Sequence, residues 1–239
     1  MTAPPRSFRL SGHSATFDLR RHAARADLAD VALAGKTFAQ HYAQAVPRTC
    51  VPEFATMYDK PGGIQTSELL IGERFGLLDI SGGWAWGYSI HDHYVGYVSA
   101  DTLTTVHEAD ALPTVPHSDP VESARAFLGM RYVWGGRGGA GIDCSGLVQR
   151  GFASAGVAAP RDSDMQLDEL GNHLDDKAAL LRGDLVFFPG HVGIMVDGEH
   201  LLHATRHHGK TVIEPLVDVV TRVANDHRPA IVARKRICQ

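Results

Sequence analysis

The chain has 239 residues, of which 44% are hydrophobic and 21% charged, and its formal net charge is -4. This length allows one large domain or two modest ones, and the composition is ordinary for a soluble globular protein. Apart from Arg234, Lys235 and Arg236 there is no basic block, which argues against a nucleic-acid partner.

The cysteines and the N-terminus bear on the cellular compartment. Cys50, Cys144 and Cys238 are too few and too widely spaced for a disulfide framework. Residues 1–21 are polar and basic and lack the apolar stretch of a signal peptide. No segment approaches the roughly 20 apolar residues that a membrane span requires. We therefore expect a cytoplasmic protein that has no membrane partner.

The first part of the chain predicts an extension and a small β-domain. Residues 1–35 read as an N-terminal extension, irregular at first and then helical over residues 23–33. In residues 36–104, glycines break short apolar runs at 75–80, 84–90 and 94–98, a pattern typical of a small antiparallel β-barrel. Residues 105–118 contain two prolines and are interpreted as a linker.

Residues 119–239 predict a second, α+β domain. Asp119 and Pro120 are suited to cap and open a helix. The glycine-rich loop 135–141 is followed by Asp143 and Cys144, where a second helical pattern begins. Strands follow at 184–188, 191–196, 201–205, 211–213 and 231–236, with a short helix at 215–223. Helices first and strands later indicate an α+β fold.

Cys144 is the candidate nucleophile because of its place at a helix start. Free amides and the helix dipole stabilise a thiolate there, so we expect a lowered pKa and an outward-pointing sulfur. The same N–H groups could hold an oxyanion. A buried structural cysteine is the plain alternative.

His191 is the candidate base and His203 the candidate third member of a triad. They lie on consecutive predicted strands joined around Asp197 and Gly198. A two-residue loop would place the two imidazoles on opposite faces, whereas a three-residue loop, 197–199, pairs position 193 with His203 and puts both on one face. We therefore predict an odd loop length or a bulge. Alternatively, His203 is a core histidine bonded to backbone.

Two other readings of the histidines and of the chain stay open. Four histidines gather near the second of these strands, which allows a metal protein, but no carboxylate or thiol completes a recognisable ligand spacing; they are His200, His203, His207 and His208. We expect no metal and no other cofactor. A noncatalytic cell-wall-binding protein is a further alternative, against which the complete triad argues.

Six ordered pieces of the second domain resemble the NlpC-type peptidoglycan cysteine peptidases. They are YVWGG (132–136), DCSGLVQ (143–149), PRDSDMQ (160–166), RGDLVFF (182–188), GHVGIMV (190–196) and LLHA (201–204). The resemblance implies a papain-like α+β catalytic domain and the triad Cys144, His191 and His203.

The same resemblance implies substrate contacts around the triad. Tyr132 would lie beside the nucleophile and shape the oxyanion site. Asp143, Ser145 and Ser163 would line the cleft for the peptide. Each has a plain alternative: Asp143 as a helix cap, Ser145 as a first-turn residue and Ser163 as a turn residue. Arg161 reads as a structural ion-pair partner.

Residues 67–103 resemble the bacterial SH3-like domains that precede this catalytic domain in the subgroup that recycles cell-wall fragments. The pieces LLIGE, GGWAW and HYVGYV carry the likeness. In that subgroup an acid and a tyrosine of the barrel hold the free amine of an N-terminal L-alanine. Tyr94 is the candidate tyrosine and Glu68 the candidate acid, with barrel core and a solvated strand position as alternatives.

The resemblance implies hydrolysis of the γ-D-glutamyl–diamino acid bond in peptidoglycan stem peptides with a free N-terminal L-alanine. A murein peptide is thus the expected partner. An amidase or acyltransferase that uses the same Cys-His-His triad on another substrate is the alternative within enzymes. The oligomeric state, the diamino acid and the roles of Cys50 and Cys238 stay open.

Overall fold

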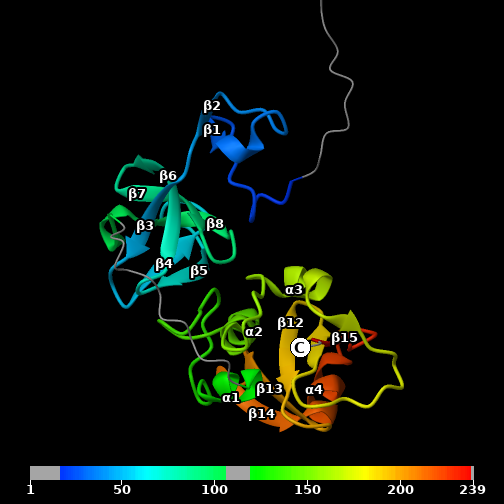
Figure 1. The fold of residues 1–239 in the computed structure, drawn as a ribbon. Coiled ribbons are helices and arrows are strands. Elements are labelled where there is room, and N and C mark those ends of the chain that lie inside the picture. Colours follow the sequence, from blue (N-terminus) through cyan, green and yellow to red (C-terminus); the bar gives the residue numbers. More distant parts are fainter. Residues whose placement is uncertain (1–16, 106–118, 238–239) are drawn as a thin grey trace, which may run out of the picture.

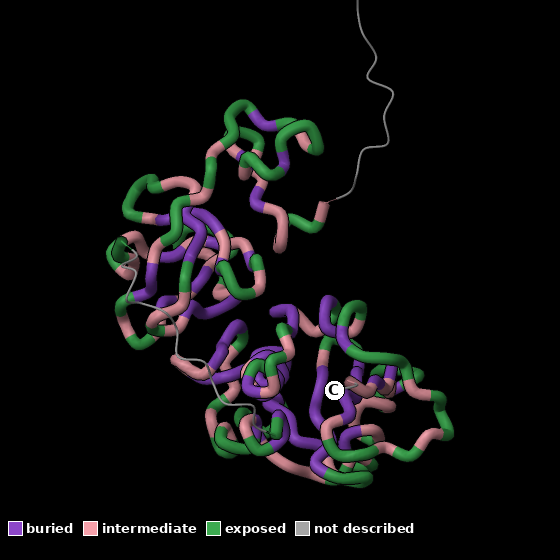
Figure 2. Tube along the Cα trace, in the orientation of Figure 1, coloured by how far each residue is buried: buried purple, intermediate pink, exposed green. Residues whose placement is uncertain are grey.

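A computed structural model of the protein describes residues 17–105 and 119–237 (Figure 1). Most of the predicted linker, residues 106–118, and the first part of the predicted extension, residues 1–16, lie outside the described residues, as does Cys238. The described chain forms a small β-domain and a mixed α/β domain, each with buried side chains at its centre (Figure 2).

The β-domain is a seven-stranded antiparallel sheet that curls around one core. Its strands in spatial order are β5 (Gln65–Leu70), β4 (Phe54–Tyr58), β8 (Val95–Ser99), β7 (Trp84–Ser89), β6 (Arg74–Ser81), β3 (Val46–Cys50) and β9 (Leu103–Thr105). A 3-10 turn, η2 (Ala100–Thr102), precedes β9. Gly82 and Gly83, both with positive φ, form the tight turn between β6 and β7, as such a hairpin requires. The three runs predicted from sequence are β6, β7 and β8.

The N-terminal segment is not helical, so the predicted helix over residues 23–33 is wrong. This region holds a two-stranded parallel sheet, β1 (Leu28–Asp30) with β2 (His41–Ala43), and one 3-10 turn, η1 (Val31–Leu33). The Asp30 side chain caps η1, and Gly35, with φ +76°, follows it. Because β2 pairs with β1, the barrel sheet begins at Val46 and not at residue 36.

The α/β domain is a six-stranded sheet with helices on both faces. The strands in spatial order are β10 (Asn172–His173), β15 (Ala233–Arg236), β11 (Leu185–Phe188), β12 (His191–Met195), β13 (His200–Thr205) and β14 (Lys210–Pro215). The helices are α1 (Pro120–Arg125), α2 (Cys144–Ala153), α3 (Ser163–Glu169) and α4 (Leu216–Val223). The fold is thus the mixed α/β arrangement expected from the sequence.

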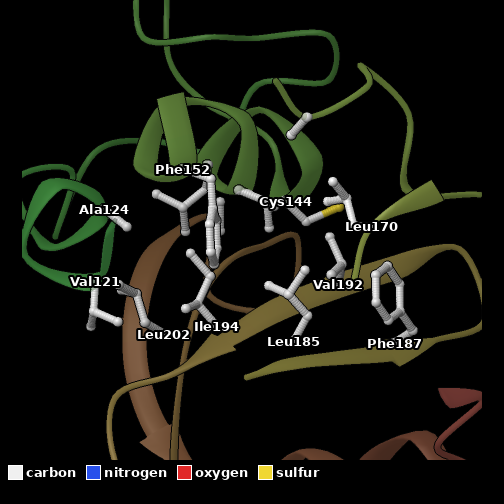
Figure 3. Packing of buried hydrophobic residues seen from close by; sticks show 14 of the residues in the cluster. Val121, Ala124, Cys144, Phe152, Leu170, Leu185, Phe187, Val192, Ile194 and Leu202 are labelled. Atoms are coloured by element: carbon white, nitrogen blue, oxygen red, sulfur yellow. The ribbon is translucent and has the colours of Figure 1, made fainter. Parts of the chain in front are cut away.

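Alternation along the central strands places α2 and α4 on opposite faces. Val192 and Ile194 of β12 pack with Leu147 and Phe152 of α2 (Figure 3). Met195 of β12, on the other face, packs in the cluster that contains Val219 of α4. Helix α3 was not predicted, because only Met165 and Gln166 of its seven residues are buried and the apolar pattern is too weak.

The two domains are joined by buried polar contacts. Arg137, 3% exposed, donates from Nη1 and Nη2 to the two carboxylate oxygens of Glu73 on the barrel, at 2.6 and 3.0 Å. Asp92 of the barrel accepts from Gln149 of α2 at 2.8 Å. None of the helices in the described parts of the chain is long and apolar enough to cross a membrane.

Candidate active site

Cys144 is the first residue of α2, as the sequence predicted. Asp143 is the N-cap residue, with extended backbone, and its Oδ1 accepts from the N–H of Gly146 at 2.7 Å. The glycine-rich loop brings Gly136 so close to the helix that a Cβ at Gly146 would lie 2.3 Å from the Gly136 carbonyl oxygen. Only glycine therefore fits there, and the loop holds the helix start in place.

The surroundings of Cys144 correct the expectation of an exposed thiolate. Cys144 is 5% exposed and part of the core between α2 and β12 (Figure 3). Burial, with the negative charge of Asp143, raises the pKa of the thiol to about 12, while backbone N–H groups of Val192 and Ser145 act in the opposite direction. Desolvation outweighs the effect of the helix start, so burial favours the protonated thiol.

The two histidines share one face of the sheet, and the predicted loop length is confirmed. Ile194 pairs with Leu202 and Met195 with Leu201, and the N–H of Val196 donates to the carbonyl of His200 at 2.9 Å. The loop therefore has three residues, 197–199. His191 Nε2 lies 2.7 Å from His203 Nδ1. The two rings form a direct hydrogen-bonded pair.

Burial keeps both rings neutral. It lowers the pKa of His191 to about 3, with a further contribution from His203. It also lowers the pKa of His203, against the opposing effect of the Glu214 carboxylate. A neutral imidazole has a free lone pair, so His191 has the ionisation state that a base for the Cys144 thiol requires.

Asp143, Ser145 and Arg161 form a buried network in the cleft wall. Arg161, 1% exposed, donates from Nη2 to Oδ2 of Asp143 at 2.7 Å and from Nη1 to Ser145 Oγ at 3.0 Å. Oδ2 of Asp143 also accepts from the N–H of Gly135 at 2.8 Å. Asp143 and Ser145 border the cleft, but their polar atoms are committed to the cap and the ion pair. Arg161 is the structural partner that the sequence suggested.

Two neighbouring pockets, which share Trp134 and Gly190 and are together called the cleft here, lie between the barrel and the histidines. The first part of the cleft is lined by Arg20, Thr66, Tyr94, Trp134, Asp143, Cys144, Ser145, Asp162, Ser163, Asp164 and Gly190. Its second part shares Trp134 and Gly190 with the first and adds Tyr132, His191, His203 and Arg206, among others. Ser163 and Tyr132 thus lie where the resemblance implied. Burial and the neighbouring Cys144 raise the pKa of Tyr132, so its hydroxyl stays a proton donor.

The barrel end of the cleft holds an acid that sequence reasoning missed. The hydroxyl of Tyr94, 5% exposed, donates to Oδ2 of Asp162 at 3.0 Å. Nη1 of Arg20 donates to the same oxygen at 2.9 Å. Oδ1 of Asp162 has no hydrogen-bond donor within residues 17–105 and 119–237. Burial raises the pKa of Asp162. The signal was Asp162 itself, inside the quoted piece PRDSDMQ.

The prediction that Glu68 borders the cleft is corrected. Glu68 is fully buried, and its carboxylate accepts from the backbone N–H groups of Arg137, Gly139 and Ala140 at 2.7, 2.9 and 2.9 Å. These three bonds hold the glycine-rich loop against β5. The side chain is absent from both parts of the cleft, so its acceptors are not available to a ligand.

Three further residues at the centre and far end of the cleft were not singled out from sequence. Trp134, 52% exposed, and Gly190 border both parts. The guanidinium carbon of Arg206 lies 5.6 Å from the centre of the Trp134 ring, which is a cation–π distance. Within the part of the chain that is described, no group of three or more His, Cys, Asp or Glu is placed to hold a metal ion.

Two models of known protein families match parts of the chain. Residues 129–224 match the NlpC/P60 family model, and residues 57–103 match that of the bacterial dipeptidyl-peptidase Sh3 domain.

Two relatives are named γ-D-glutamyl-L-lysine dipeptidyl-peptidase. The Bacillus subtilis protein is 35% identical over 127 residues, which cover 46% of this chain and 42% of that protein. The Bacillus cereus protein is 33% identical over 113 residues, which cover 44% of this chain and 33% of the relative. The matches thus span less than half the length of these relatives.

Solved structures were also compared with the chain. The peptidoglycan hydrolase RipB from Mycobacterium tuberculosis is 30% identical, with 56% of this chain and 69% of that chain covered and a TM-score of 0.43. The two family models, in the order found here, fix the assignment. The chain carries an NlpC/P60 domain, and an SH3-like domain of the bacterial dipeptidyl-peptidase type precedes it.

Proposed function

We propose that this protein is a cysteine endopeptidase that hydrolyses the γ-D-glutamyl–diamino acid bond of peptidoglycan stem peptides with a free N-terminal L-alanine. The observation that carries the proposal is the combination, in one cleft, of Cys144 at the start of α2 and Asp162 at the barrel end. The names of the two Bacillus relatives agree with this bond.

The chemistry follows from the placement of Cys144 and His191. Cys144 Sγ attacks the γ-carbonyl of D-glutamate while His191 takes the thiol proton, and His191 then gives that proton to the leaving amine of the diamino acid. Water afterwards hydrolyses the acyl-enzyme with His191 as base. The N–H of Cys144 has no acceptor within its own helix, because it is the first helical residue, and can donate to the oxyanion.

Asp162 takes the role that the sequence reasoning had assigned to Glu68. Asp162 lines the cleft, its Oδ1 has no hydrogen-bond donor among the described residues, and a partly buried carboxylate favours a cation beside it. Asp18, Asp162 and Asp164 surround the single guanidinium of Arg20, which leaves an excess of negative charge. A substrate ammonium fits this end, whereas an acylated L-alanine nitrogen gains nothing from it.

The requirement for a free amine implies a released fragment as the substrate, since the L-alanine of intact wall is acylated. The cytoplasmic location expected from the sequence agrees with such a substrate and stays a prediction.

The test compares L-Ala-γ-D-Glu-diaminopimelate with its N-acetylated form, and also the corresponding lysine peptides, with release of the diamino acid followed by mass spectrometry. We expect the free peptides to be cut, the acetylated ones to be cut poorly, and Cys144→Ala to be inactive. Equal cleavage of free and acetylated peptides would remove the amine argument. No cleavage of any of them would favour the amidase or acyltransferase alternative.

A further inference from the structure

The hydrogen-bonded pair of histidines continues to a carboxylate that lies outside the predicted triad. His203 Nε2 lies 2.8 Å from Oε1 of Glu214 on β14. Arg222 of α4 donates to the same oxygen from Nη2 at 2.6 Å and to Oε2 from Nη1 at 3.2 Å. His208 Nε2 lies 3.3 Å from Oε2. Both oxygens of Glu214 are therefore occupied.

The sheet register explains why these groups meet. His203 pairs with Val212, and Glu214 lies two residues further along β14, hence on the same face. Because the loop between β12 and β13 has three residues, His203 lies opposite Gly193. His191 lies two residues from Gly193 on β12 and therefore on the same face. The side chains of His191, His203 and Glu214 thus form a diagonal across three neighbouring strands, at the separation where long side chains reach one another.

The ionisation state of Glu214 fixes the direction of the hydrogen bonds. Burial alone would raise its pKa, but hydrogen bonds from Arg222, His203 and His208 lower it to about 2. At neutral pH the carboxylate is therefore an acceptor only. The ring nitrogen that faces it, Nε2 of His203, has to carry the proton.

The protonation of the other ring nitrogens of His203 and His191 follows from that of His203 Nε2. A neutral imidazole carries one N–H, so Nδ1 of His203 is an acceptor. It lies 2.7 Å from Nε2 of His191, which therefore donates to it. The lone pair of His191 is left on Nδ1, the nitrogen that can receive the thiol proton. Without Glu214, both histidines could exchange tautomers, and half of the arrangements would present an N–H to the thiol.

We propose that Glu214 is a positioning residue of the reaction, which fixes the tautomers of His203 and His191 and stabilises the imidazolium that forms when His191 takes the proton of Cys144. The inference rests on the proposed function for its catalytic consequence, but the tautomers themselves do not. Arg222 is the counter-ion that keeps Glu214 in place, and its positive charge limits how strongly Glu214 stabilises the imidazolium.

The charges around the two rings predict shifts of opposite sign for two variants. The carboxylate of Glu214 favours protonated histidine, whereas Arg222 disfavours it. The other ionisable groups near the rings or along this part of the cleft are Tyr132, Arg206, His208, Asp226 and His227, and neither variant changes them. The pKa of His191 determines one limb of the profile of kcat/KM against pH. Glu214→Gln should move that limb to lower pH, and Arg222→Gln should move it to higher pH.

The first experiment measures kcat/KM against pH for the full-length protein with the free tripeptide. We expect Glu214→Gln to lose on the order of tenfold in kcat, with KM nearly unchanged, and Glu214→Asp to recover part of the loss. His200→Gln is the matched control, because His200 is on the same strand but pairs with Asp197 in the exposed loop. Shifts of the same sign in the Glu214 and Arg222 variants would overturn the proposal.

The second experiment separates this inference from the proposed function. Nitrogen NMR of ¹⁵N-histidine-labelled protein reports the tautomer of each ring whether or not the peptide is a substrate. We expect both His191 and His203 to carry the proton on Nε2 in the wild type, and a mixture of tautomers in Glu214→Gln. A wild type with the proton of His203 on Nδ1, or an unchanged spectrum in Glu214→Gln, would overturn the inference even if the peptide is cut.

Discussion

The barrel meets the catalytic domain at two places that use similar residues in different ways. At one, Glu68 and Glu73 of the barrel hold the glycine-rich loop and Arg137, and the three backbone N–H groups and the guanidinium occupy their carboxylates. At the other, Tyr94 of the barrel and Arg20 donate to one oxygen of Asp162, a cleft-lining residue whose other oxygen has no hydrogen-bond donor among the described residues.

The first place attaches the barrel to the second domain, whereas we propose that the second place binds substrate. A buried carboxylate whose oxygens are all hydrogen-bonded stabilises the fold through those bonds, since removing a partner leaves its charge uncompensated. A partly buried carboxylate that lines a cleft, has one oxygen without a hydrogen-bond donor among the described residues and has its pKa raised by burial is instead a candidate ligand-binding group. The predictions below test whether the first place acts on stability and the second on substrate recognition.

The largest effect is expected at the attachment. Arg137→Met leaves the carboxylate of Glu73 buried without its ion-pair partner, which should cost roughly 3–5 kcal/mol in the free energy of unfolding. Urea unfolding measures it. Arg182→Met, at an exposed pair with Asp119, is the matched control and should cost about 1 kcal/mol or less. Similar losses in both variants would contradict the role given to the attachment.

The next largest effect is expected at Asp162 and should be confined to the free amine. Asp162→Asn removes a charge-assisted hydrogen bond to the substrate ammonium, worth about 1.5–3 kcal/mol, so kcat/KM for the free tripeptide should fall roughly 10- to 150-fold. The acetylated peptide should be cut as by the wild type. Asp168→Asn, exposed in α3 and outside the cleft lining, is the control. An equal loss with both peptides would show a general defect instead.

The preference for a free amine should depend on pH through the same carboxylate. Burial raises the pKa of Asp162 above its ordinary value of 3.8, and protonation removes the charge that attracts the ammonium. The ratio of kcat/KM for the free and acetylated peptides should therefore be highest at neutral pH and fall as the pH is lowered through that raised pKa. In Asp162→Asn the ratio should not vary over this range. A constant ratio in the wild type would argue against Asp162 as the recognition group.

The smallest effect is expected at Tyr94. Tyr94→Phe keeps the ring in the barrel core but removes its hydrogen bond to Asp162, worth about 0.5–1.5 kcal/mol, so kcat/KM for the free peptide should fall roughly two- to tenfold. Tyr97→Phe is matched to it, because the Tyr97 hydroxyl bonds to Arg25 and not to Asp162. If the two variants behave alike, Tyr94 has no special part in the cleft.

Local sequence was sufficient for the core of the candidate site. Asp143 followed by Cys144 after a glycine-rich loop specifies a capped helix start, which depends on neighbouring residues only. The strands of the second domain follow from alternation, and the requirement that His191 and His203 share a face predicted the three-residue loop. Such features are decided within a few residues of one another, so the sequence contains them.

Only the tertiary structure decided which charged groups lie together. Glu68 and Asp162 are both acids in recognisable pieces, but their surroundings come from segments far away in the chain: Arg20 and Asp162 are 142 residues apart. Glu214 joins the histidines because β14 pairs with β13 in one particular register. The buried, protonated state of Cys144 also depends on the packing of α2 against β12. Desolvation and long-range pairing are properties of the assembled fold, and no local pattern of residues encodes them.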